Sequence, residues 1–172
     1  MFFYLLLALF LFTLPFAIAA KSYAPWIPVA SKDINRILKL LNLKPAQIFY
    51  ELGCGDGRVV CAVAKKFPQN LCVGLELAFP MFLISLIRRH LTSCPNLEIK
   101  NANLFSTDIS NADVVYIYGL PKIINSRLRE KLEKELKPGA LVISYAFQIE
   151  AWQPLKTDRP TDRDLPIFVY RM

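Results

Sequence analysis

An acidic residue and three glycines at alternate positions follow a predicted strand in the sequence FYELGCGDGR, residues 49–58. Glu51 ends the apolar run, and Gly53, Gly55 and Gly57 lead into a predicted helix. Glycine adopts positive φ without strain and lets the backbone approach a ligand with no Cβ in the way. The spacing therefore predicts a loop that makes room for a bulky, nucleotide-like cofactor.

The order of the acid and the glycines indicates which cofactor this loop accepts. A pyrophosphate-binding turn reads G-x-G-x-x-G and places the diphosphate against a helix N-terminus. This loop reads E-x-G-x-G-x-G, and its carboxylate suits a cationic ligand better than a phosphate. A second apolar strand ends in Glu76, about 20 residues past the glycines, where a carboxylate can accept ribose hydroxyls. The combination favours S-adenosylmethionine; the alternative is a glycine turn beside two ordinary strand-end acids.

Predicted strands and helices alternate along the chain and would position these residues. The strands cover residues 48–52, 71–76, 97–101, 113–118 and 141–147, and the helices cover residues 58–67, 81–91 and 123–136. This alternation predicts an α/β fold with a mostly parallel sheet, helices on both faces and a last, antiparallel strand over 164–170. Ligands of such sheets bind beyond the carboxyl ends of the strands. Four polar or aromatic residues fall there, namely Glu51, Glu76, Asn103 and Tyr118.

Residues 1–20, MFFYLLLALFLFTLPFAIAA, contain no charged side chain. As a helix they would span about 30 Å, the thickness of a bilayer's hydrocarbon core. A secretory signal peptide is the alternative, since residues 17–19 (AIA) resemble a cleavage site, but the basic n-region of such a peptide is absent. The positive-inside rule predicts a single-pass transmembrane anchor with the catalytic domain in the cytoplasm, because basic residues follow the apolar run, namely Lys21, Lys32, Arg36 and Lys39.

The rest of the chain divides into a connecting segment and one domain. Residues 21–44 form a predicted linker and N-terminal helix: residues 23–30 are proline-rich, and Ser31 is the predicted N-cap. The helix is amphipathic, with apolar residues at Ile34, Ile37, Leu38 and Leu41. Residues 45–172 then provide a core of single-domain size.

Charge and cysteine content exclude some classes of function. The net charge is +7, but the basic residues are spread along the chain and alternate with acids in RLREKLEKE, residues 127–135. This pattern is typical of a solvated helix face, so we expect no nucleic-acid partner and attribute the charge to anionic lipid headgroups or an acidic protein partner. The cysteines lack metal-ligand spacing, and we predict no metal site and free thiols at Cys54, Cys61, Cys72 and Cys94.

Several motifs resemble those of a family of class I methyltransferases that modify protein lysines. They are W-I-P at 26–28, E-L-G-C-G-D-G-R at 51–58, G-L-E at 74–76, A-D-V-V at 112–115 with Pro121, the charged run at 128–139 and W-Q-P at 152–154. The family includes archaeal broad-specificity lysine methyltransferases and the mitochondrial enzymes that methylate the ATP synthase c subunit and the adenine nucleotide translocase. The resemblance covers residues 23–156 and implies a Rossmann-like methyltransferase fold and N-methylation of a lysine side chain in a protein substrate, with a membrane protein preferred.

The resemblance also implies roles for individual residues. Glu51 would bind the methionine amino group and Glu76 the ribose, while the three glycines leave room for the cofactor. Further cofactor contacts are expected from Leu77 and from Asn103 and Leu104, the last two beside the adenine. Asn103 departs from the aspartate that is common in the family, and residues 78–80 (AFP) replace its usual asparagine-proline.

Other residues carry two interpretations each. Asp56 either contacts the ligand or caps the following helix. Trp26, Tyr118 and Tyr145 are candidates for the acceptor side, where aromatic faces hold an ammonium group by cation–π attraction; packing is their alternative role. At the level of function, a methyltransferase of a lipid or membrane-soluble small molecule, or a non-catalytic membrane protein that binds S-adenosylmethionine, remains an alternative to the lysine methyltransferase.

Overall fold

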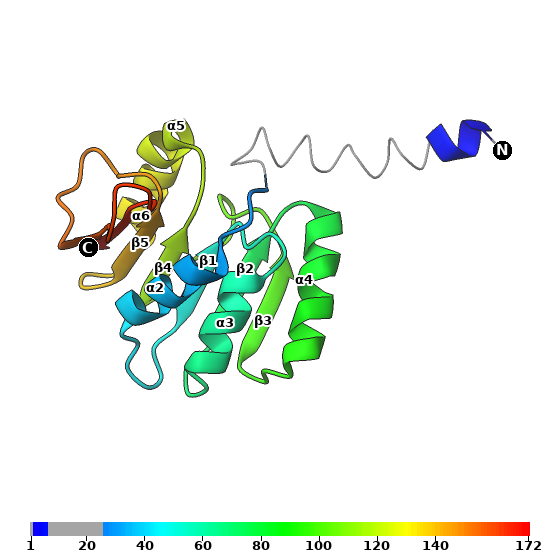
Figure 1. Ribbon diagram of the computed structural model, residues 1–172, viewed down its shortest axis with the longest axis horizontal. Coiled ribbons are helices and arrows are strands. Elements are labelled where there is room, and N and C mark those ends of the chain that lie inside the picture. Colours follow the sequence, from blue (N-terminus) through cyan, green and yellow to red (C-terminus); the bar gives the residue numbers. More distant parts are fainter. Residues whose placement is uncertain (1, 7–25) are drawn as a thin grey trace.

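The computed structural model describes residues 2–6 and 26–172 and has a seven-stranded sheet at its centre (Figure 1). The strand order is β3-β2-β1-β4-β5-β7-β6. In this order, the five strands from β3 to β5 are parallel to one another. β7 is antiparallel to both β5 and β6. The strands comprise β1 (Phe49–Leu52), β2 (Cys72–Glu76), β3 (Leu97–Asn101), β4 (Val114–Ile117), β5 (Leu141–Tyr145), β6 (Lys156–Asp158) and β7 (Ile167–Arg171).

Helices cover both faces of this sheet (Figure 1). One face packs against α2 (Ser31–Leu41), α3 (Arg58–Lys66) and α4 (Phe79–Thr92). The other face packs against three consecutive helical elements, α5 (Pro121–Ile123), the π-helix η1 (Ile124–Leu128) and α6 (Arg129–Glu135), with a kink at Ser126. Alternate strand residues enter the two cores, as Phe49 and Tyr50 do, and this explains why the central strands are apolar without interruption.

The structure confirms the predicted α/β fold and the mostly parallel sheet, with differences at several elements. α4 begins two residues early, at Phe79, because Pro80 fits the first turn of a helix. The predicted last strand begins later, at Ile167, and pairs with the three-residue strand β6, which is too short to give a sequence pattern. The predicted N-cap at Ser31 is wrong, since Ser31 is the first helical residue and Ala30 is the N-cap.

The N-terminal prediction falls mostly on residues outside the described part of the chain. Residues 2–6 are helical, whereas the remainder of the predicted anchor, at position 1 and positions 7–20, lies outside the described residues. No helix within residues 2–6 and 26–172 has the length and apolar character needed to cross a bilayer.

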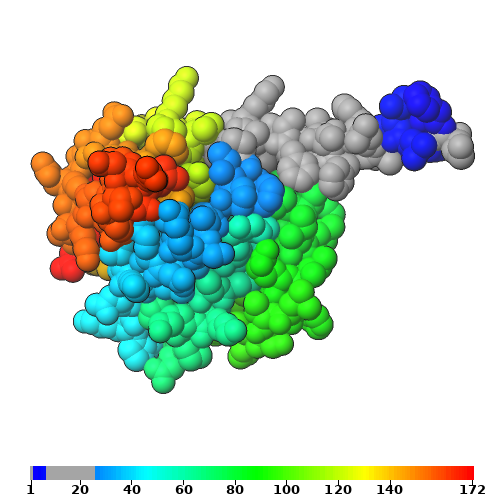
Figure 2. Space-filling view, viewed as in Figure 1, coloured from blue at the N-terminus to red at the C-terminus, as the bar shows by residue number. Residues whose placement is uncertain are grey.

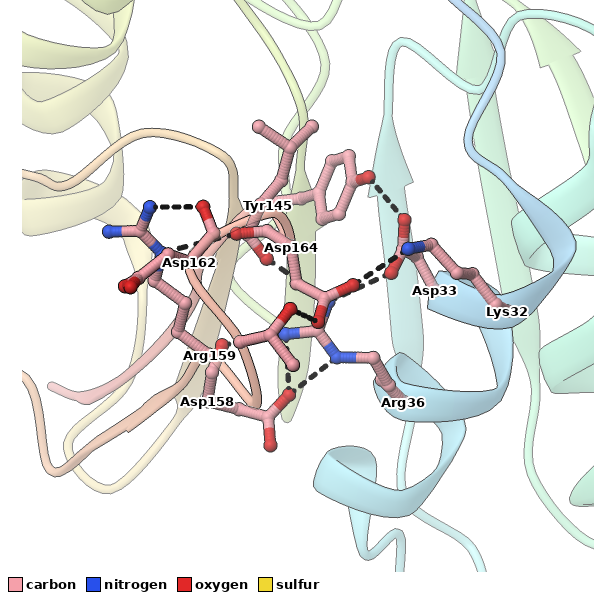
Figure 3. A network of polar contacts seen from close by, with 10 residues as sticks. Lys32, Asp33, Arg36, Tyr145, Asp158, Arg159, Asp162 and Asp164 are labelled. Atoms are coloured by element: carbon pink, nitrogen blue, oxygen red, sulfur yellow. Dashed lines mark hydrogen bonds and ion pairs between the residues drawn. The ribbon is translucent and has the colours of Figure 1, made fainter.

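A network of polar contacts joins α2 to β5 and to the C-terminal hairpin (Figure 3). The guanidinium of Arg36 donates to Asp158 (2.7 Å) and to Asp33 (2.8 Å). The hydroxyl of Tyr145 donates to the second oxygen of Asp33 at 2.8 Å. We call these four residues the α2 junction. Their hydrogen bonds connect α2 to β5 and β6.

Candidate active site

A cavity lies at the carboxyl ends of β1, β2 and β4, where the fold class places ligands. Its lining comes from five parts of the chain: residues 26–29, the glycine loop, the end of β2 with the start of α4, residues 102–104 after β3, and the end of β4. Segments that are far apart in the sequence therefore converge on one site. Most of the predicted site residues belong to this lining, namely Trp26, Glu51, Gly53, Gly55, Asp56, Glu76, Leu77, Asn103, Leu104 and Tyr118.

The glycine loop is held tightly to the neighbouring strand. The N–H groups of Gly53 and Cys54 both donate to the carbonyl of Leu75 at 2.9 Å. Gly55 has a φ of 55°, in the left-handed region, and a Cβ there would lie 2.6 Å from Cδ1 of Trp26. The loop thus brings its backbone to the cavity and leaves no space for a side chain at Gly55.

Gly57 lies where α3 and α4 come close to each other. It lies outside the cavity lining, and a Cβ on it would meet the Cβ of Ser85 in α4 at 3.0 Å. Gly57 therefore allows α3 and α4 to approach each other closely, and its use in cofactor clearance stays a prediction.

Glu51 is a buried carboxylate with little compensation for its charge. Its Oε2 accepts the N–H of Val60 at 2.7 Å, and within the described residues no side-chain cation pairs with it. Burial raises the pKa of Glu51 well above its ordinary value, and the negative charges of Asp56 and Glu76 raise it further. A cationic group in the cavity would supply the missing partner.

Glu76 combines a place in the cavity wall with a structural role. Its Oε2 accepts the N–H of Gly55 and its Oε1 accepts the N–H of Ala78, each at 2.7 Å. Burial raises the pKa of Glu76, although these backbone donors oppose the shift. Each carboxylate oxygen retains a further lone pair, so Glu76 can still accept a hydroxyl from a ligand.

Asp56 is neutralised by two arginines. Arg58 donates to its carboxylate at 2.8 Å and Arg88 of α4 at 2.7 Å. Burial opposes ionisation, but the hydrogen bonds from Arg58 and the charge of Arg88 lower the pKa of Asp56 below its ordinary value. Arg58 also donates to the carbonyl of Val29 at 3.1 Å. Asp56 thus touches the cavity and also joins the loop to α4 and to residues 26–29.

The structure separates the three aromatic candidates for the acceptor side. Trp26 and Tyr118 line the cavity, whereas Tyr145 does not. The hydroxyl of Tyr145 is engaged by Asp33, and its ring packs edge-on against Tyr118 with centroids 4.8 Å apart. The surroundings of Tyr145 thus agree with its alternative role, which is packing.

Residues 102–104 form the remaining wall. The Oδ1 of Asn103 accepts the N–H of Phe105 at 2.9 Å, and the carbonyl of Asn103 accepts the N–H of Thr107 at 3.1 Å. Leu104 is buried beside it. This turn holds both residues against the cavity, and their contacts with the adenine stay a prediction.

Sequence reasoning missed several lining residues. Tyr116 lies two positions before Tyr118, so both side chains project to the same side of the sheet. This spacing could have identified Tyr116 as a lining residue. Met81 enters the lining from the first turn of α4, and no local motif marks it. Burial raises the pKa of the Cys54 thiol, which packs beside Gly74.

The residues present fit S-adenosylmethionine. The cavity offers an uncompensated carboxylate for an ammonium group, a second carboxylate at the end of the next strand for ribose hydroxyls, and a side-chain-free loop between them. The fold and this site define a class I methyltransferase that uses S-adenosylmethionine.

Comparison with known proteins places the chain within that class. The family described as "ANTKMT methyltransferase domain" matches residues 51–156, and the chain belongs to this family. Over 151 residues it is 34% identical to the protein-lysine N-methyltransferase of Saccharolobus islandicus, with 86% of this chain and 92% of the relative covered. It is 30% identical to the Homo sapiens lysine N-methyltransferase of the ATP synthase c subunit, with 87% of this chain and 64% of the human protein covered.

A solved structure gives the same fold. The crystal structure of an RNA methyltransferase from Salinibacter ruber, in complex with S-adenosyl-L-homocysteine, superimposes with a TM-score of 0.77 and 28% sequence identity. The match covers 84% of this chain and 93% of that protein. The ligand of that structure is the demethylated product of the cofactor that the cavity fits.

Proposed function

We propose that the protein is a protein-lysine N-methyltransferase. The observation that carries this proposal is the 34% identity to the Saccharolobus islandicus protein-lysine N-methyltransferase over 92% of that relative. Two vertebrate relatives are likewise named as lysine N-methyltransferases, one for the c subunit of ATP synthase and one for the adenine nucleotide translocase. The matches span the glycine loop and the cavity, so the same site would serve lysine here.

In the proposed complex, S-adenosylmethionine supplies a methyl group on a sulfonium that is already a good leaving group. Glu51 would bind the methionine amino group and Glu76 the ribose, with Leu77, Asn103 and Leu104 around the nucleoside. The backbone of Gly53 and Gly55 would lie against the cofactor. The protein then mainly has to align the acceptor with the methyl group and to exclude water.

The acceptor lysine must be neutral to attack. Its ordinary pKa of about 10.4 implies a cost of about 4 to 5 kcal/mol at pH 7. Burial between Trp26 and Tyr118 would lower that pKa, because desolvation disfavours the ammonium form. Burial raises the pKa of Tyr118, so its phenol stays protonated and its oxygen can accept a hydrogen bond from the amine.

The apolar segment at residues 1–20 is proposed to anchor the chain in a membrane with the catalytic domain on the cytoplasmic side. The absence of charge in this segment and the lysines that follow it support the proposal. A membrane protein would then be the preferred substrate. Alkaline carbonate extraction of membranes from cells that produce the full chain tests the anchor: retention in the pellet supports it, and release overturns it.

RNA is the second candidate acceptor. The Salinibacter ruber structure is that of an RNA methyltransferase, and the net charge of +7 would assist binding to phosphates. Against RNA, the helical run 127–135 mixes acids with the basic residues. Methylation of a lipid or of a membrane-soluble small molecule is a further alternative, and it depends on the proposed membrane anchor.

One labelling experiment separates these acceptors. The full chain is incubated with methyl-tritiated S-adenosylmethionine and with membranes, soluble protein or RNA from the source organism. Methyl-lysine in acid hydrolysates of protein supports the proposal. Label confined to RNA or to the lipid extract overturns it, and so does cofactor binding without any transfer.

Two variants serve as controls for the labelling experiment. At a cofactor concentration near the dissociation constant of the wild type, Glu51→Gln should lower the methylation signal about 10- to 100-fold, because its cofactor affinity falls by that factor. Lys65→Gln alters an exposed residue of α3 outside the cavity lining and should keep full activity.

A further inference from the structure

The outer face of α4 is apolar although it is exposed. We use this name for Phe79, Leu83, Ile84, Ile87 and Leu91, whose exposed fractions lie between 43% and 77%. Four of them follow the i, i+4 spacing, and together they form one stripe along the helix. Figure 1 places α4 at the edge of the sheet over β3, and Figure 2 shows this part of the chain (green) at the margin of the molecule.

α4 is apolar on its exposed side as well as on the side where Phe82 and Leu86 pack against the core. Ser85 is completely buried and donates its hydroxyl to the carbonyl of Phe82, whereas Ile87 is 62% exposed. A surface helix of a soluble domain normally buries its apolar stripe. Contiguous exposed apolar surface of this kind marks an interaction site.

The charges on α4 select the kind of partner. The helix has no acidic residue, and its C-terminal half carries Arg88, Arg89 and His90. Arg88 is engaged by Asp56, Arg89 is exposed one turn beyond the buried Ser85, and His90 is exposed beside Ile87 and Leu91 of the outer face. An exposed apolar stripe on a helix that has no acidic residue and an exposed arginine near its C-terminal end suits the acyl chains and anionic headgroups of a membrane surface.

The outer face of α4 adjoins the place where the N-terminal segment reaches the domain. Ala78 and Met81, at the start of α4, line the same cavity as Trp26 and Ile27. Trp26 and Ile27 are themselves about half exposed. Tryptophan is favoured at the boundary between water and lipid. Only five residues, 21–25, separate Trp26 from the uncharged segment 1–20, and a chain of this length spans at most about 22 Å between Ala20 and Trp26.

We propose that the outer face of α4 lies on the surface of a lipid bilayer and holds the mouth of the cavity at the headgroup level. The uncharged N-terminal segment would keep the domain at the membrane, and α4 would fix its orientation there. If the proposed lysine methylation holds, the acceptor lysine lies in the headgroup region, beside the bilayer rather than in free solution.

Fluorescence quenching in vesicles tests this orientation. Cys94→Ser removes the half-buried thiol, and Ile87→Cys or Leu91→Cys then provides one accessible site for an NBD label, since the remaining cysteines are buried. The full chain is reconstituted in vesicles that contain phosphatidylglycerol, with or without doxyl-labelled phosphatidylcholine. We expect about twofold or stronger quenching by the doxyl lipid, because an interfacial helix sinks its apolar face about 5–10 Å into the headgroup boundary.

The control is Lys65→Cys, labelled in the same background on the exposed part of α3. We expect little quenching there. Equal quenching at both helices, or none at α4, overturns the proposal. A blue-shifted α4 label that doxyl lipid does not quench also overturns it, because a protein segment or a second copy then covers the helix. Cofactor binding by each labelled variant verifies its fold, and the quenching readout is independent of methyl transfer, so the two proposals fail separately.

Discussion

Two carboxylates are buried to the same degree in this protein but have opposite surroundings. Asp33 in the α2 junction is 4% exposed and receives hydrogen bonds from Arg36 and Tyr145. Glu51 in the cavity is 5% exposed and receives one hydrogen bond, from the backbone of Val60. The chain thus compensates one buried charge with its own side chains and leaves the other largely uncompensated.

The difference teaches how to distinguish structure from function at a buried acid. Burying a charge is costly unless it is paired and hydrogen-bonded. At Asp33 the partners come from the chain, so the charge stabilises the contacts of α2 with the rest of the fold. At Glu51 burial raises the pKa and the described residues supply no side-chain cation, so a cationic ligand would be the missing partner, and this indicates a function.

The largest expected effect is on the α2 junction. Arg36→Met removes the cation from Asp33 and from Asp158, and we expect the free energy of unfolding to fall by about 3 kcal/mol, because the buried carboxylate loses its charged partner. Chemical denaturation measures the loss. The dissociation constant of S-adenosylmethionine should stay within about twofold of wild type, since Arg36 lies outside the cavity lining. A large loss of cofactor affinity would break the comparison.

Glu51→Gln should mainly weaken cofactor binding, whereas Arg36→Met should mainly lower stability. The amide still accepts the Val60 N–H but lacks the charge, and we expect cofactor affinity to fall about 10- to 100-fold, the effect of losing a hydrogen bond to a charged group. Calorimetric titration with S-adenosylmethionine gives the affinity. Unchanged affinity would show that Glu51 is an ordinary buried acid.

The pH dependence sharpens this second prediction. Since the pKa of Glu51 is raised in the folded state, the folded protein retains a proton that the unfolded chain releases. The cofactor-free wild type should therefore lose stability, relative to Glu51→Gln, as the pH rises above about 4 to 5 and until the raised pKa is passed. Denaturation of both proteins across this range measures the difference, and parallel curves would contradict the assignment.

A smaller effect is expected at the loop. Gly55→Ala imposes positive φ on alanine, at about 1 to 2 kcal/mol, and also drives its Cβ against Trp26. The double variant Gly55→Ala/Trp26→Ala removes the clash but leaves the backbone strain. A double-mutant cycle on stability and cofactor affinity should give non-additive effects. Additive effects would mean that the indole does not rest on Gly55.

The smallest effect is expected at an exposed ion pair beside the α2 junction. Lys32 donates to Asp164 at 2.7 Å, but its side chain is mostly exposed. We expect Lys32→Met to change the free energy of unfolding by less than about 0.5 kcal/mol, as for other exposed ion pairs. A loss as large as that of Arg36→Met would show that the network acts as one unit.

Most of the fold could be predicted because its signals are local. The parallel strands are uninterrupted apolar runs, and the glycine loop and the strand-end acid Glu76 follow each other at short range. The strand β6 could not be predicted, because three residues without apolar alternation carry no pattern. The π-helix η1 was also missed; Ser126 departs from helical φ and ψ within a run that otherwise has helical spacing.

The cavity could be predicted in part. Glu51 and Glu76 were identified because they lie at or next to the carboxyl end of a strand, and parallel strands bring these ends together. The surroundings of Tyr145 could not be identified, since its partner Asp33 is 112 positions away in the sequence. The same holds for Asp56, whose second arginine lies 32 positions away on α4. Tertiary pairing at such separations leaves no trace in local spacing.

The two hydrogen bonds of Glu76 have a consequence for redesigning the enzyme to accept cofactor analogues with altered sugars. Replacing Glu76 would free the amides of Gly55 and Ala78, so a change meant to reshape the sugar pocket would also release the loop. Asn101 holds the carbonyl of Glu76 from the neighbouring strand at 2.8 Å. Engineering of analogue selectivity should therefore begin at Leu77, which borders the cavity without anchoring this loop.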